Sequence, residues 1–207
     1  MKKWIFCLIS ILVLGMSGIV SAASDSGDNE LSSLVFPKVG AVFFMNGGLR
    51  GDERVEEQVR EAVHKKFIAL QNISYLNDGL MKAKFQEYSF RKNIRDGNDL
   101  YPYGEATLEQ LADFGKENRL HQLIVVECYL RNVSEKQSNP RPGVEIKSEF
   151  TSETEIIVKV ISPNQGIIVE EFSFDGDGKS NIAIKSYWSA FSKSVRKLRS
   201  EWKPSFK

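Results

Sequence analysis

The stretch that decides the fold is TEIIVKVISPNQGIIVEEFSF, residues 154–174. In its first half, apolar side chains alternate with Glu155 and Lys159, which is typical of a β-strand with one buried face. The sequence PNQG at 163–166 combines proline, asparagine and glycine, the residues that favour tight turns. The stretch therefore predicts two antiparallel strands joined as a hairpin.

The second strand of this hairpin is expected to have one apolar face and one wet face. Its pattern puts Ile168, Phe172 and Phe174 on the apolar face. The charged residues expected on the outward side of the two strands are Glu155, Lys159, Glu170 and Glu171. One face of this part of the sheet is therefore predicted to meet water.

Two further strands are predicted to lie in the interior of the sheet. Residues 38–45, KVGAVFFM, and residues 123–130, LIVVECYL, are nearly continuous apolar runs. Such runs are typical of strands that are covered on both faces. Helical patterns separate the two runs, which favours parallel pairing through crossovers in this part of the chain.

Three amphipathic helices are expected. The first begins at Glu53, the second at Thr107, where TLEQ forms a capping box between Thr107 and Gln110, and the third closes the chain. The apolar stripe of the first helix consists of Val55, Val59, Ala62, Val63, Phe67 and Leu70. The stripe of the last helix consists of Ile184, Tyr187, Trp188, Phe191, Val195, Leu198 and Trp202.

Residues 71–106 are predicted to contain one or two strands. The apolar residues that suggest them are Ile73 and Tyr75, then Phe85, Tyr88 and Phe90. Asn77-Asp78-Gly79 is interpreted as the turn between them. The expected order of elements is then β-α-β-α-β-β-β-α, which indicates one α/β (α+β) domain over residues 37–203 with a mixed sheet of about five strands and about three helices.

The amino-terminal residues predict export. Lys2 and Lys3 precede an apolar run that ends in small residues, so residues 1–22 are interpreted as a signal peptide cleaved near Ala22. The run is short for a membrane anchor, and no stable membrane insertion of the mature chain is expected. Residues 23–36 are polar and acidic, as in a flexible leader. We expect a periplasmic or extracellular location.

Charge and cysteine content exclude several classes of protein. Without Lys2 and Lys3 the formal charge of +1 becomes −1, and the charges are mixed along the chain, so no nucleic-acid partner is expected. Cleavage would leave Cys128 as the single thiol, which excludes an intramolecular disulfide. Cys7 lies too early in the apolar run to carry a lipid anchor.

The element order and three of its segments resemble a known group of exported domains. These segments are KVGAVFFMNG at 38–47, TLEQLADFGKENRLHQLIVVECYLRN at 107–132 and the hairpin at 154–174. They resemble the α/β domain at the amino terminus of TolB-type proteins, which also occurs in the curli secretion channel subunit and in outer-membrane lipoprotein activators of penicillin-binding proteins. The resemblance implies a non-enzymatic envelope domain that docks on other proteins. Residues 131–150 depart from the channel type, since they are too polar for a membrane-spanning hairpin.

The connector at 46–53, NGGLRGDE, has the layout of a phosphate-binding loop but is interpreted otherwise. It lacks the first glycine of a dinucleotide fingerprint and the lysine and hydroxyl residue of a P-loop. Asp52 and Glu53 stand where a helix begins, and they would repel a phosphate while capping the helix themselves. No nucleotide and no other cofactor is expected.

The residues that commonly support catalysis or metal binding show no complete pattern. His64 and His121 have no companion at ligand spacing, and Cys128 is expected to be a core thiol. The segment 175–179, DGDGK, lacks two residues of a calcium loop and is interpreted as a solvated turn before the last helix. The chain is therefore predicted not to be an enzyme.

The remaining candidates concern recognition. Tyr101, Pro102 and Tyr103 form an aromatic cluster in a polar loop and are the candidate partner-binding residues. Trp202 and Phe206 are weaker candidates of the same kind. The function expected is a protein-interaction or assembly domain of the bacterial envelope with other envelope proteins as partners. Two alternatives stay open: a small-ligand binder or hydrolase with a site near loops 46–53 and 95–106, and self-assembly into a homo-oligomer through a sheet edge.

Overall fold

The computed structural model describes residues 36–49, 52–94, 106–137 and 147–204. The strands are β1 (Lys38–Met45), β2 (Ser74–Tyr75), β3 (Gln122–Gln137), β4 (Ser148–Ser162) and β5 (Ile167–Ser180). The helices are α2 (Glu53–Ile68), α3 (Asp78–Arg91), α4 (Leu108–Glu117) and α5 (Ala183–Glu201), with a short 3-10 helix η1 (Gly47–Leu49). Among these described segments, no helix is both long enough and apolar enough to span a bilayer.

The five strands form one mixed sheet in the order β2-β1-β3-β4-β5. β1 is parallel to both β2 and β3, and β3, β4 and β5 are antiparallel neighbours. The predicted combination of parallel crossovers followed by an antiparallel meander is therefore confirmed, as is the single α/β domain with a five-stranded sheet.

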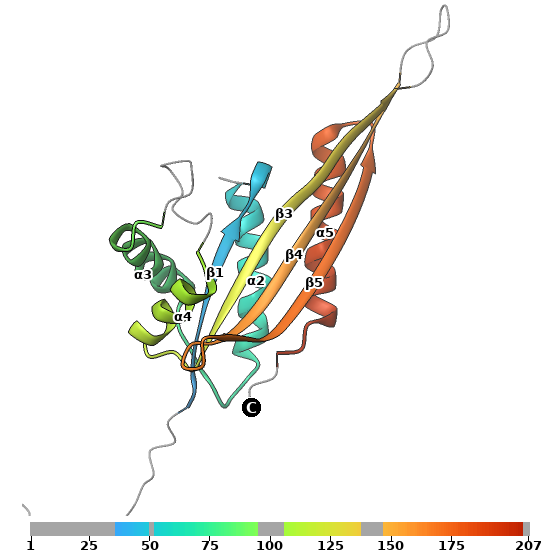
Figure 1. Cartoon of the computed structure of the whole chain (residues 1–207). Helices are drawn as coiled ribbons and strands as arrows, with labels where there is room; N and C mark the ends of the chain where they lie inside the picture. The colour runs from blue at the N-terminus through green and yellow to red at the C-terminus, as the bar shows by residue number, and fades with distance from the viewer. Residues whose placement is uncertain (1–35, 50–51, 95–105, 138–146, 205–207) are drawn as a thin grey trace, which may run out of the picture. The chain divides into compact units, whose positions relative to one another are not determined.

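Helices cover the two faces of the sheet unequally (Figure 1). In β1, Ala41 packs into the core under α2 and α5, whereas Val42 and Phe44 pack into a second core under α3 and α4. β3 shows the same alternation, with Ile124 in the first core and Val125 in the second. β1 and the first half of β3 are thus buried on both faces, as their continuous apolar sequences predict.

β4 and β5 are covered mainly on one face, by α5. Small residues let the helix approach closely: a Cβ added to Gly176 or Gly178 would lie 2.0 Å from a backbone oxygen of α5. Two buried hydroxyl pairs join the same layers, Ser152 with Ser186 at 2.7 Å and Thr154 with Ser194 at 2.9 Å. The other face of these strands carries the half-buried and exposed polar side chains that the hairpin pattern predicts.

The prediction of strands after Asn77 is wrong, because this segment forms α3. The Asn77 side chain accepts a hydrogen bond from the Leu80 N–H at 3.2 Å and so caps a helix rather than making a turn. Met81, Phe85 and Tyr88 then fall on one buried helical face, whereas Phe90 is 89% exposed. The described chain therefore has four α-helices, one more than expected, and only Ser74–Tyr75 of this region is a strand.

One further expectation was wrong, and the strand predicted at 123–130 extends further than expected. Residues 175–179 form the second half of β5 rather than a turn, and much of the polar segment 131–150 belongs to the β3–β4 hairpin. In DGDGK the exposed charges of Asp175, Asp177 and Lys179 alternate with buried glycines. Glycine and aspartate favour turns by composition, but here their period of two follows the pleat of a strand.

A β-bulge corrects the faces assigned to the second hairpin strand. Val160 pairs with Glu170, but Ile161 pairs with Ile168, so Val169 is an extra residue. The bulge moves Ile168 to the face opposite that of Phe174, because Ile161 belongs to the second core. Glu170 consequently lies half-buried on the α5 face and not on the wet face.

Candidate protein-interaction site

Strand β5 forms an edge of the sheet. It pairs with β4 along one side, and among the described residues no strand pairs with its other side. Figure 1 shows β5 at this outer position, with α5 behind it. An edge strand presents unpaired N–H and C=O groups, which can pair with a strand from another chain.

The beginning of β5 exposes three consecutive aliphatic side chains. Ile167, Ile168 and Val169 are 47%, 39% and 47% exposed. The bulge at Val169 explains the run, because it breaks the alternation that would otherwise bury every second residue. Exposed β-branched residues on an open edge are the usual features of a site for strand addition.

The wet face of β4 and β5 is strongly acidic. Four exposed or half-buried carboxylates form two cross-strand pairs, Glu155 opposite Asp175 and Glu153 opposite Asp177. Arg131 binds Glu155, with Nε at 2.6 Å from Oε2, and the Ser173 hydroxyl donates to its Oε1 at 2.7 Å. These contacts, led by the Ser173 hydrogen bond, lower the pKa of Glu155.

Next to this acidic patch, a polar row continues over β3. Lys159 Nζ lies 2.9 Å from both carboxylate oxygens of Glu127, and the Tyr129 hydroxyl donates to Glu127 at 3.1 Å. Arg131 stacks over the Tyr129 ring at 4.1 Å. Burial and the neighbouring Glu127 carboxylate raise the pKa of Tyr129 to about 12. The charged groups of this row are paired with one another. The carboxylates of the acidic patch on β4 and β5 have fewer partners of opposite charge.

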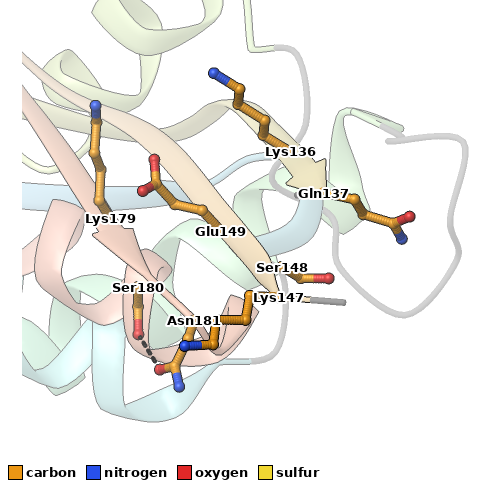
Figure 2. Close-up of a pocket in the computed structure, with 8 residues that line it drawn as sticks. All are labelled: Lys136, Gln137, Lys147, Ser148, Glu149, Lys179, Ser180 and Asn181. Atoms are coloured by element: carbon orange, nitrogen blue, oxygen red, sulfur yellow. Dashed lines mark hydrogen bonds between the residues drawn. The ribbon is translucent and has the colours of Figure 1, made fainter. Parts of the chain in front are cut away.

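At the far end of β5 the charge reverses. A hollow of about 510 Å³ lies where β3 ends, β4 begins and β5 ends, and Figure 2 shows its lining residues. Lys136, Lys147 and Lys179 line it together with Glu149. The wet face of β5 therefore runs from acidic at Asp175 and Asp177 to basic at Lys179.

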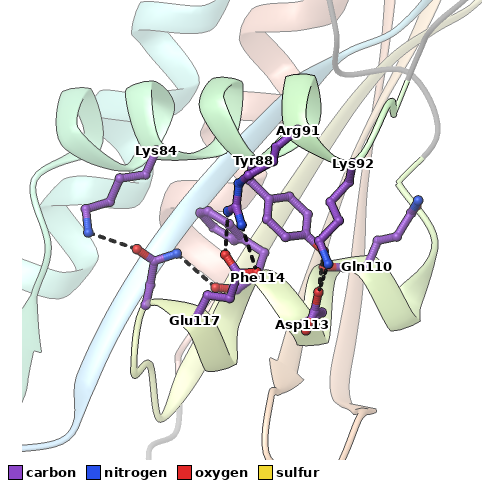
Figure 3. A network of polar contacts seen from close by, with 9 residues as sticks. Lys84, Tyr88, Arg91, Lys92, Gln110, Asp113, Phe114 and Glu117 are labelled. Carbon is purple, nitrogen blue, oxygen red and sulfur yellow. Dashed lines mark hydrogen bonds and ion pairs between the residues drawn. The ribbon is translucent and has the colours of Figure 1, made fainter.

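A second hollow, of about 800 Å³, lies beside the contact of α3 with α4 and is lined in part by Tyr88, Lys92, Gln110 and Asp113. Its polar groups bind one another (Figure 3). Tyr88 donates to the Gln110 carbonyl at 2.9 Å and to Asp113 at 3.0 Å, and Lys92 lies 3.0 Å from Asp113. Lys92 and Tyr88 lower the pKa of Asp113, and burial raises that of Tyr88. The polar groups of this hollow therefore already have partners within the chain, and their contacts join α3 to α4.

The connector before α2 is confirmed as an acidic cap. Asp52 Oδ1 accepts from the backbone N–H groups of Arg54 and Val55, at 3.2 and 3.3 Å. Its other oxygen accepts from the Tyr187 hydroxyl of α5 at 3.2 Å. Two of the free N–H groups at the start of the helix are thus bound by this chain's own carboxylate.

Asp78 is the one buried acidic residue of the described chain, at 8% exposure. The Tyr75 hydroxyl donates to one of its oxygens, and His64 Nδ1 lies 3.9 Å from the other. Burial raises the pKa of Asp78, although Tyr75, His64 and Arg60 oppose the shift. The cluster ties β2 and the start of α3 to α2.

Replacing Asp78 by asparagine is expected to make stability less dependent on pH. A folded-state pKa above the ordinary 3.8 means that Asp78 contributes stability below that value and loses it as the pH rises through the folded pKa. The amide removes the buried charge while Tyr75 still donates to its oxygen. Melting curves from about pH 4 to pH 7 should show Asp78→Asn at least as stable as the parent at neutral pH.

Asp113 is a matched control for this experiment, because the pKa of its carboxyl is lowered instead. It contributes stability above its ordinary pKa and loses it as the pH falls, so Asp113→Asn should be less stable than the parent at neutral pH. If Asp78→Asn also loses stability at neutral pH, then His64 and Arg60 hold an ionised Asp78 more strongly than burial disfavours it.

Cys128 and His121, which were also considered as site residues from the sequence, contribute to the fold. Cys128 is fully buried, as expected of a core thiol, and burial raises its pKa. His121 Nδ1 accepts a hydrogen bond from the Lys38 N–H at 2.9 Å, which joins β1 to the start of β3. In the part of the chain that the structure describes, no three His, Cys, Asp or Glu side chains gather in a way that would hold a metal ion.

The recognition residues predicted from the sequence divide into two groups. Tyr101, Pro102, Tyr103 and Phe206 lie outside the described residues, as do the expected signal peptide and residues 23–35 of the leader. Trp202 is 0% exposed, so it is a core residue and not an interface anchor. The β5 edge was expected only in general terms. Its aliphatic run was visible in the sequence, but the bulge that exposes it was not.

Comparison with known proteins assigns no family. No protein-family model and no curated protein matches the chain. Similar solved structures include a lipoprotein from Neisseria meningitidis, at 8% identity and a TM-score of 0.41, covering 70% of this chain and 85% of that one. The LpoB C-terminal domain from Salmonella enterica has 8% identity and a TM-score of 0.37, covering 68% and 82%.

A putative neuraminyllactose-binding hemagglutinin homolog from Helicobacter pylori has 9% identity and a TM-score of 0.40, covering 81% of this chain and 87% of that one. Solved structures similar to this chain thus include bacterial lipoproteins. At these identities and TM-scores they decide neither the family nor the activity of this chain.

Proposed function

We propose that this protein is an exported, non-enzymatic domain of the bacterial envelope that binds another protein by adding a strand to the free edge of β5. The observation that carries the proposal is the edge itself. It is fourteen residues long, it begins with three exposed aliphatic side chains, and no described strand covers it. Natural proteins usually protect such an edge, so a long open one with aliphatic residues favours a binding role.

Charged residues at the beginning of the edge are expected to abolish binding without unfolding the protein. Ile167 and Val169 are each 47% exposed, so the double variant Ile167→Lys, Val169→Lys should change the melting temperature little. Lysine on an edge opposes strand pairing, and the affinity for the partner should fall at least about tenfold. The matched control is Ile184→Lys, because Ile184 is an exposed aliphatic residue on α5, at 55% exposure.

Cross-linking in intact cells measures this effect for a partner of any sequence. A photoreactive amino acid at Ser173 on β5 should give one discrete adduct with another protein, and the lysine double variant should remove it. The same amino acid at Ile68, which is 65% exposed at the end of α2, should give no such adduct. Equal adducts from both positions, or an adduct that survives the edge lysines, would contradict the proposal.

The alternative of a small-ligand site or hydrolase receives less support. Asp52 caps α2 and the carboxylate of Asp113 is bound by Lys92 and Tyr88, so neither acid is available as a free catalytic group. Asp96 and Asp99, two acids of the loop 95–106 that was expected to border such a site, lie outside the described residues.

A further inference from the structure

We infer that the strand which binds β5 alternates basic and apolar residues, with lysines or arginines beside Asp175 and Asp177. This inference rests on the proposed function and adds the chemistry of the partner. It is argued from the charges that the sheet register brings together on the wet face of the edge.

Two like-charged pairs follow one another across β4 and β5. Asp175 lies opposite Glu155, and Asp177 lies opposite Glu153. Directly opposite side chains of antiparallel strands have Cβ atoms about 4.5–5.5 Å apart, and like charges at this distance are destabilising. The two pairs therefore concentrate negative charge on one small area of the open face.

Only half of this charge is neutralised within the chain. Glu155 is bound by Arg131, and Asp177 by Lys193 at 3.0 Å. Within the described residues, the carboxylates of Glu153 and Asp175 have no ion pair and no hydrogen-bond partner. A cation placed next to the edge would relieve the repulsion, so the edge selects a positively charged partner by complementarity.

The pleat determines where those cations lie in the added strand. Asp175 and Asp177 are two residues apart, so they point to the same face, and a sixth strand would place every second side chain beside them. Its intervening side chains would lie on the α5 face, next to the buried Phe174 and to Gly176, where α5 packs against the strand. The matching pattern is therefore basic at alternate positions and apolar between them.

A second copy of the chain matches this edge poorly. β5 carries Glu170, Glu171, Asp175 and Asp177 against a single Lys179, a net charge of −3. Pairing two copies through β5 would bring a net charge of −6 to one seam, which Coulomb repulsion opposes. A basic partner strand is consequently favoured over self-association.

Two short peptides test the inference directly with the intact protein. One alternates lysine and valine, and the other alternates glutamate and valine. In two-dimensional NMR titrations, the lysine peptide should shift the amide signals of β5, and the glutamate peptide should leave them unchanged. Raising the salt concentration to about 0.5 M should strongly weaken binding of the lysine peptide, because the attraction is between exposed charges.

The double variant Glu153→Gln, Asp175→Asn tests how much the two unpaired negative charges contribute to binding. It removes the two unpaired carboxylates and one member of each like-charged pair, so the melting temperature should stay the same or rise. Affinity for the lysine peptide should nevertheless fall about tenfold. Glu57→Gln, which removes an exposed acid of α2, is the matched control and should leave the affinity unchanged.

The outcomes separate this inference from the proposed function. Equal binding of both peptides at β5 overturns the basic pattern but leaves edge binding intact. Failure of both peptides, with the Ser173 cross-link still present in cells, also overturns only the inference. Failure of both peptides together with loss of that cross-link rejects the proposed function as well. A β5-dependent dimer in analytical ultracentrifugation would assign the edge to a second copy and overturn the inference.

Discussion

Replacing Gly178 by alanine is expected to destabilise the protein severely. A Cβ at this position would lie 2.0 Å from the backbone oxygen of Ser186 and 2.6 Å from the backbone nitrogen of Ala190. Both atoms belong to the backbone of α5, so no side-chain rotation relieves the clash, and the helix itself must move away from the sheet.

Moving α5 breaks more than one contact. The buried hydroxyl pair of Ser152 and Ser186 lies beside Gly178, and the helix contributes Phe191 and Leu198 to the first core. Overpacking and the loss of these contacts together should lower the free energy of unfolding by about 3 kcal/mol or more. That is a large share of the roughly 5–15 kcal/mol that typically stabilises a domain.

Urea denaturation followed by circular dichroism measures the effect. The matched control is Gly166→Ala: Gly166 has φ +69°, but nothing lies within 4 Å of the added Cβ. Only backbone strain then opposes the change, at about 1–2 kcal/mol. If Gly178→Ala costs no more than Gly166→Ala, the close packing of α5 on β5 is not a determinant of this fold.

Truncating Trp202 to alanine is the second change with a large expected effect. Trp202 is fully buried just after the end of α5, and its ring meets Phe67 of α2 edge-on at a centroid distance of 5.6 Å. Phe67 in turn stacks on Tyr75 of β2 at 4.6 Å. The indole therefore closes the end of the first core, where α2, α5 and the edge strand β2 meet.

Removing so large a buried side chain leaves a cavity, and Trp202→Ala should cost about 3–5 kcal/mol. Trp202→Phe is the informative comparison. The indole Nε1 is buried without a hydrogen-bond partner in the described residues, so phenylalanine loses no hydrogen bond and should cost less than about 2 kcal/mol. Chemical denaturation of both variants measures the two losses, and equal losses would show that a phenylalanine ring cannot replace the packing of the indole.

The strand and helix patterns predicted the sheet well where burial follows the local sequence. The apolar runs at 38–45 and 123–130 are strands covered on both faces, and the capping box of Thr107 and Gln110 is present at α4. In each of these cases the information lies within a few residues of sequence, because a buried strand or a helix cap depends on its own side chains.

The errors arose where composition and periodicity disagree. Asn77-Asp78-Gly79 has the composition of a turn but caps a helix, and DGDGK has the composition of a turn but continues a strand. Packing decided between the alternatives. α3 buries Phe85 and Tyr88 against α4, and α5 packs closely against the glycines of β5. In both cases the deciding neighbour is a separate element, α4 for α3 and α5 for β5, and lies outside the short segment whose composition suggested a turn.

By itself the sequence determined the class of the protein: one α/β domain with a mixed sheet, a buried thiol at Cys128 and an acidic helix cap. These properties follow from local periodicity, from residue counts and from residues that act on their own backbone. Only the tertiary structure decided which strand is an edge, how the bulge at Val169 exposes three aliphatic residues and which carboxylates face each other across β4 and β5. Edge position depends on which strands pair across the whole sheet, and register depends on how two strands meet, so both exist only once the strands have packed together.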